Sequence, residues 1–179
     1  MKRTVVEVLK QMIPVIVGIL VALFINSWNE QRKDQNYIDE ISKSIVTELE
    51  ESRIDIVENI PKQNRLMDSL RFYAKDESLS LLDIVLKTEG FHSPQIRINS
   101  WEAISRTKIE LVPYEQLKAL SNIENSKELL EDKEKYLMTF VYSNMRENSS
   151  DIKETIIFLL LDIISTEMSI KENIENFKM

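Results

Sequence analysis

The hydrophobic pattern of the chain begins with one long apolar segment near the N-terminus. Residues 12–25 form an unbroken run of 14 apolar or small residues, and a mostly polar stretch follows at once. As a helix this run is about 21 Å long, shorter than the ~30 Å hydrocarbon core of a bilayer. With its flanks, the segment from residue 5 to 28 reaches about 36 Å, with Lys10 and Trp28 placed as interfacial anchors. The pattern therefore predicts a transmembrane helix.

Two other interpretations of this segment are a cleaved signal peptide and the buried end of a soluble helix. A signal peptide needs small residues at positions −3 and −1 of its cleavage site. The available pairs, Ala22 with Phe24 and Ile25 with Ser27, do not meet that requirement. The length of the apolar run alone suits a buried helix equally well, but its flanks favour a span. We therefore predict an anchor over residues 1–29 and an extramembrane domain over 30–179.

Beyond the anchor, apolar residues recur at intervals of three and four, which predicts amphipathic helices. Between Gly18 and Pro61 there is no proline or glycine, so we expect the membrane helix to continue into the first of these helices. Pro61 is expected to kink or restart it. The stripes consist of Ile38, Ile41, Ile45, Leu49, Ser52, Ile56 and Ile60 in this helix, and of Ile152, Ile156, Leu160, Ile163, Glu167, Ile170, Ile174 and Phe177 in the last.

Start and stop signals divide the remainder of the chain. Gly90 is a good helix-stop residue. Asn99 and Asn125 are each followed three residues later by a glutamate, the spacing of a capping box, and both predict helix starts. Pro113 suits a first helical turn. The last helix is expected to begin after Ser149 or the serine that follows it.

The predicted fold is all-α. Three long segments, 34–75, 125–148 and 150–178, are expected to pack as an antiparallel bundle, with shorter helices within 79–122 capping one end. The whole chain has two glycines and four prolines, so turns are few and the helices are long. Residues 156–164 are apolar on two sides and too short for a second span. They fit the bundle interior or a contact with another subunit, and we favour the interior.

Composition and charge exclude several classes of function. The chain has no cysteine, so disulfides, thiolate zinc sites and cysteine nucleophiles are excluded. Its net charge is −7, with +2 in residues 1–11 and −9 in the rest, and such an acidic surface repels nucleic acid. Basic residues before the span, against Arg32 and Lys33 after it, predict a cytoplasmic N-terminus and a periplasmic domain at the inner membrane.

The residues that could carry chemistry do not form a recognisable site. Glu89 and His92 have the Glu-x-x-His spacing of di-iron bundles, but His92 is the only histidine, and such a site needs two of these motifs. No nucleophile elbow or glycine-rich phosphate loop is present. Asn148-Ser149-Ser150 fits a glycosylation acceptor or a helix N-cap, and we favour the cap. Trp101 fits a ligand groove or buried packing, and we favour packing. We therefore predict no catalytic, metal or cofactor site and no enzyme.

Two segments resemble a known family. The stretch IVGILVALFINSWNEQRK, residues 16–33, resembles the signature of domain-of-unknown-function family 6090, membrane proteins common in Bacteroidota. The residues that match are Gly18, Ala22, Asn26, Trp28, Asn29, Glu30, Arg32 and Lys33, whereas Ser27 stands where a second asparagine is usual. Residues 100–123 are similar to the tryptophan-containing segment of the family, without the glycine usual near Thr107. The resemblance implies a membrane anchor and a helical domain, with no known catalytic residues.

The predicted function is a membrane-anchored, non-enzymatic scaffold, accessory or sensor-like protein whose partners are the lipid bilayer and an unknown protein. The alternative is a ligand-binding or enzyme-accessory module that uses residues 88–112 as a pocket. A cleft near Phe91, His92 and Trp101 would favour the alternative, and a filled bundle with exposed apolar patches would favour the scaffold.

The apolar segment also carries a small-residue face. Gly18, Ala22 and Asn26 follow one another at intervals of four, so they lie on one side of the predicted span. Small residues let two helix backbones approach closely, and an asparagine can hydrogen-bond across the contact. This face predicts a transmembrane helix–helix contact and a homo-oligomer.

Overall fold

The computed structural model describes residues 2–177, with side chains from residue 12 onward, and within that range it contains helices and no strand. The all-α prediction is confirmed. The elements are α1 (Lys2–Phe72), α2 (Leu81–Lys87), α3 (Asn99–Ser105), the 3-10 helix η1 (Ile109–Leu111), α4 (Tyr114–Asn144) and α5 (Ser150–Glu175). These elements divide between two compact units, Met1–Ile41 and Ser42–Met179.

The first unit consists of the N-terminal part of α1. Its large apolar side chains from Met12 to Ile25 are all exposed, with exposed fractions from 49% at Ile16 to 73% at Phe24. The helix is long and apolar enough to cross a membrane. Trp28 is also exposed, whereas the side chain of the other predicted anchor, Lys10, lies outside the described residues.

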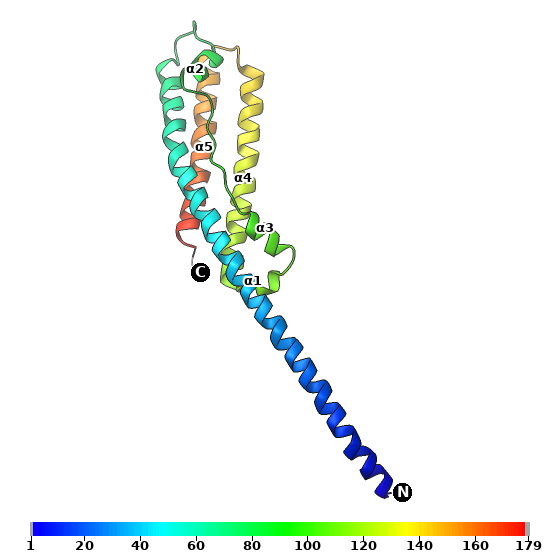
Figure 1. The fold of residues 1–179 in the computed structure, drawn as a ribbon. Coiled ribbons are helices and arrows are strands. Elements are labelled where there is room, and N and C mark those ends of the chain that lie inside the picture. The colour runs from blue at the N-terminus through cyan, green and yellow to red at the C-terminus, as the bar shows by residue number, and fades with distance from the viewer. Residues whose placement is uncertain (1, 178–179) are drawn as a thin grey trace. The chain divides into compact units, whose positions relative to one another are not determined.

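The second unit is a bundle of three long helices, formed by α1 from Ser42 onward, α4 and α5 (Figure 1). The bundle prediction is confirmed, but the antiparallel arrangement holds only for α5, because α1 and α4 run in the same direction. The cause is the segment 91–98, which has no helical structure and returns along the bundle between α2 and α3. Eight extended residues cover about 26 Å, enough to carry the chain back along the helices.

Several predicted helix boundaries are wrong. α1 runs through Pro61 without a break, so the helix does not restart there, and its packing offsets the lost hydrogen bond and the steric clash of an interior proline. α4 begins at Tyr114, with Pro113 at its N-cap, so Asn125 lies inside the helix and caps nothing. Proline suits the start of a helix because no N–H is needed there.

The short helices lie at opposite ends of the bundle, so the prediction that they cap one end is wrong (Figure 1). At one end, the first amides of α2 at Leu81 and Leu82 donate to carbonyls just beyond α4, over 2.8 and 3.0 Å. At the other end, α3 begins at Asn99 as predicted, but without the capping box. The Glu48 carboxylate of α1 caps it instead, accepting the Ser100 amide at 3.0 Å.

The core of the second unit follows the predicted stripes. In α5 the side chains of Ile156, Leu160, Ile163, Glu167, Ile170 and Ile174 are buried. In α1 the buried members are Ile45, Leu49, Ser52 and Ile56. The run 156–164 lies partly in the bundle interior and partly on the surface, since Phe158 and Leu161 are exposed. The interior position is therefore confirmed for one side of the run only.

Candidate functional site: an apolar cavity in the helical unit

The second unit contains a cavity of about 360 Å³ beside the segment 91–98. Most of its wall is apolar and comes from three helices: Leu81, Leu82 and Val85 of α2, Leu137, Met138 and Val141 of α4, and Leu160 and Ile163 of α5. Its polar lining is small and comes from Gln63, His92, Ser93 and Glu134, with Tyr142 at the wall. An apolar cavity of this size with a few polar groups is typical of a small-molecule site.

A reversal of the chain after α2 places His92 at the cavity. The Gly90 amide donates to the Val85 carbonyl at 3.0 Å, the bond that closes a Schellman motif. Glu89 and Gly90 have positive φ values of 65° and 93°. Glycine adopts this conformation easily, whereas at Glu89 it is strained. The motif turns the chain so that Phe91 and His92 both line the cavity.

The segment 91–98 is fixed to one face of α1 by side chains. The Arg97 amide donates to Ser52 Oγ at 2.8 Å, and the Arg97 guanidinium donates to Asp55 Oδ2 at 3.0 Å. Further along α1, Gln63 Nε2 donates to the His92 carbonyl at 3.0 Å. These bonds satisfy backbone groups that an extended segment would otherwise leave without partners.

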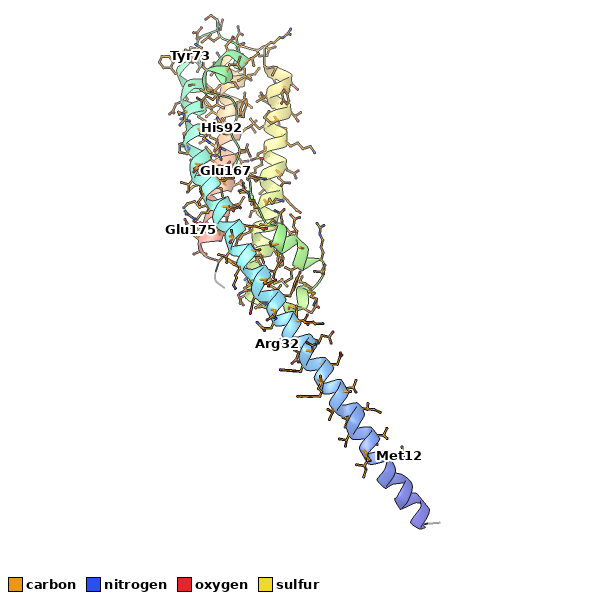
Figure 2. All side chains as sticks on the ribbon, in the orientation of Figure 1. Met12, Arg32, Tyr73, His92, Glu167 and Glu175 are labelled. Carbon is orange, nitrogen blue, oxygen red and sulfur yellow. The ribbon has the colours of Figure 1, made fainter. Side chains whose placement is uncertain are left out.

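Gln63 also joins the segment to α5. Its Nε2 donates to Glu167 Oε1 at 2.6 Å, and the exposed fractions of the two side chains are 1% and 0%. His92 and Glu167 lie near the middle of the bundle (Figure 2). Three buried atoms of this cluster have no hydrogen-bond partner within the described structure: Gln63 Oε1, His92 Nε2 and Glu167 Oε2. Unpartnered buried polar atoms are uncommon in native proteins, where such atoms are usually satisfied by protein groups or by ordered water.

Two carboxyl groups near the cavity have raised pKa values. Burial raises the pKa of Glu167 to about 7, opposed by the hydrogen bond from Gln63 and assisted by the charge of Glu134. Burial also raises the pKa of Glu134, opposed by the hydrogen bond that the Ser93 hydroxyl donates to its Oε1. The two glutamates come from α5 and α4, and Glu134 of α4 is the one that lines the cavity.

The other candidate residues of the sequence have structural roles or lie away from the cavity. Trp101 is buried in α3, and its indole N–H donates to Glu124 Oε2 at 2.8 Å, so it does not line the cavity. Ser149 accepts the Ile152 amide at 3.4 Å as the N-cap of α5, which confirms the cap interpretation. Across the described residues, no three histidine, aspartate or glutamate side chains are grouped so as to hold a metal ion.

The predicted helix–helix contact residues, Gly18, Ala22 and Asn26, are exposed on the first unit. A Cβ placed on Gly18 would meet no atom within 4 Å. The surface beside Gly18 is therefore open, and association of two copies through this face stays a prediction.

The sequence interpretation missed three polar residues that line the cavity, Gln63, Ser93 and Glu134, and Glu167, the buried partner of Gln63. One signal was present. Glu167 occupies a position in the apolar stripe of α5, and a charged residue that is buried there needs a hydrogen-bond partner. Ser52 occupies a position of the same kind in the apolar stripe of α1.

Comparisons of this chain with known protein families, curated proteins and solved structures find no match. Membership of family 6090 therefore stays a prediction from the two resembling segments.

Proposed function

We propose that the helical unit is a non-enzymatic binding module for a small, largely apolar molecule, carried at a membrane by α1. The observation that supports it is the 360 Å³ cavity, whose wall is apolar except for a few polar groups. It lies beside residues 91–93, inside the 88–112 region of the alternative sequence hypothesis. Trp101, the other residue expected there, does not line the cavity.

The scaffold role remains the second candidate. It is supported by large apolar side chains on the surface of the helical unit, where Tyr142 of α4 and Phe158 of α5 are 65% and 69% exposed. Exposed aromatic residues are enriched at protein–protein contacts.

Anchoring by α1 is supported by the exposed apolar run from Met12 to Ile25, which only lipid or another apolar partner would shield from water. We propose the inner membrane, a cytoplasmic N-terminus and a periplasmic helical unit, in accord with the basic residues before the span. The chain has no cysteine, so single cysteines at Thr4 and Ser126 can be labelled without background. An impermeant thiol reagent should label position 126 and not position 4 in intact spheroplasts, and the reverse result would invert the orientation.

Binding is tested on the full chain in lipid nanodiscs with ¹³C-methyl methionine. Met138 and Met145 line the cavity, whereas Met168 is 47% exposed on α5 and serves as an internal reference. Phenylbutanol, a small apolar probe, should shift the methyl resonances of Met138 and Met145 and leave Met168 unchanged.

A variant that fills the cavity should abolish those shifts. Val141 lines the cavity and is 4% exposed, so Val141→Phe places an aromatic ring in the space. Val57→Phe is the matched control, because Val57 is 45% exposed on α1 and does not line the cavity. Probe shifts that survive Val141→Phe would refute binding in the cavity.

A further inference from the structure

We infer that the ligand of this cavity is an apolar amine whose ammonium group contacts Glu134. This inference rests on the proposed binding function and specifies its ligand class. It is carried by the polar and aromatic groups of the cavity wall, where Glu134 is the one carboxylate among the described lining residues.

Gln63 can offer the cavity only an acceptor. Both hydrogens of its amide are already used, one donated to the His92 carbonyl and one to Glu167 Oε1. The His92 carbonyl fixes the orientation of the amide, because a carbonyl can only accept and the opposite orientation would place two oxygens against each other. The remaining atom, Oε1, is an acceptor that is buried and has no partner within the described structure, so Gln63 brings no donor to the wall.

Glu134 supplies the negative charge. Its side chain lines the cavity, where the Ser93 hydroxyl donates to one of its oxygens, and a carboxylate accepts several hydrogen bonds. Charge-assisted bonds from an ammonium to a carboxylate are stronger than neutral ones. Phe91 and Tyr142 add aromatic rings to the same wall, and such rings attract cations.

The same wall disfavours a carboxylic acid as ligand. Among the described residues that line the cavity, none is lysine or arginine. Lys133, also on α4, is absent from the wall, and its ammonium donates to Asp162 and Thr166 at 2.8 and 2.9 Å. A carboxylate ligand would therefore meet Glu134 with no lysine or arginine in the wall to offset the repulsion. An ammonium group provides both the donors and the charge that this site needs.

The test compares three probes with the same apolar body and different head groups: phenylbutylamine, phenylbutanol and phenylbutyrate. Each is titrated into the full chain in zwitterionic lipid nanodiscs, with the ¹³C-methyl resonances of Met138 and Met145 as the readout. The amine should bind at least about tenfold more tightly than the alcohol, the difference expected for a hydrogen bond to a charged group. The acid should bind more weakly than both.

Glu134→Gln should remove the preference for the amine while the alcohol binds as before. Glu128→Gln is the matched control, because Glu128 is exposed on the same helix and does not line the cavity. It should retain the full preference for the amine.

The outcomes separate this inference from the proposed function. If none of the three probes shifts Met138 and Met145, or if Met168 shifts equally, the proposed binding function fails and the inference fails with it. If the alcohol or the acid binds as tightly as the amine, the inference is overturned while the binding function stands. A preference for the amine that persists in Glu134→Gln overturns it as well.

Discussion

Replacing Glu167 with glutamine should make the helical unit more stable at alkaline pH and remove most of its pH dependence between pH 5 and 8. Glu167 is fully buried, and its pKa is raised from 4.5 to about 7, mainly by burial. The folded chain therefore holds a proton that the unfolded chain releases over that range. This contribution to stability is complete below pH 4.5 and is lost as the pH rises through 7.

The size of the effect follows from the two pKa values. The interval between 4.5 and about 7, at 1.36 kcal/mol for each pH unit, corresponds to about 3 kcal/mol. A glutamine cannot ionise, and its Oε1 can still accept from Gln63 as Glu167 Oε1 does at 2.6 Å. Glu167→Gln should therefore exceed the wild type by under about 1 kcal/mol at pH 5 and by about 3 kcal/mol at pH 8.

The measurement is urea denaturation of the full chain in mild detergent, followed by circular dichroism at a series of pH values. Glu172→Gln is the matched control, because Glu172 is exposed on the same helix, and it should follow the wild type at every pH. If Glu167→Gln differs from the wild type by the same amount at pH 5 and pH 8, Glu167 does not titrate in this range and the reasoning is refuted.

Three further predictions address other parts of the chain. Lys153 is buried and its ammonium donates to the Tyr73 and Asp76 carbonyls beyond α1, at 2.9 and 2.8 Å, so Lys153→Met should cost about 2–3 kcal/mol in urea denaturation. Glu89 has a φ of 65° at the end of α2, so Glu89→Gly should raise stability by about 0.5–1 kcal/mol, and a loss would show that its conformation is not strained. Gly18→Leu with Ala22→Leu should lower crosslinking between full-length chains while membrane insertion persists, and undiminished crosslinking would place the contact elsewhere.

The long helices could be predicted from the sequence because their apolar stripes are regular. The buried positions of α5 from Ile156 to Ile174 recur at intervals of three and four, and burial of one helix face imposes that spacing. The ends of the helices were harder to place, because capping signals are local and compete with tertiary partners. Asn125 has a capping-box spacing, yet a helix that begins at Tyr114 runs past it.

The direction of the helices and the cavity could not be predicted, because both depend on where the segment 91–98 packs. In this segment Pro94, Ile96 and Ile98 alternate with polar residues and are buried, a period of two that is typical of an extended segment. The sequence does not reveal that the segment extends along α1. Its partners there are Ser52, whose place in an apolar stripe indicates a buried role, and Gln63, an ordinary polar residue of a long helix, and only their hydrogen bonds show that they bind this segment.

The cavity follows from the same topology. A helix with its side chains is about 10 Å across, whereas a single extended segment is narrower, so three helices and one such segment fill space less completely than four helices. The space left beside the segment is lined by side chains of α2, α4 and α5. Gln63 binds the His92 carbonyl of the segment and Glu167 of α5, and this use of both its hydrogens leaves it without a donor for the cavity that it lines. The bonds that substitute for a fourth helix thus also determine which ligand chemistry the cavity can satisfy.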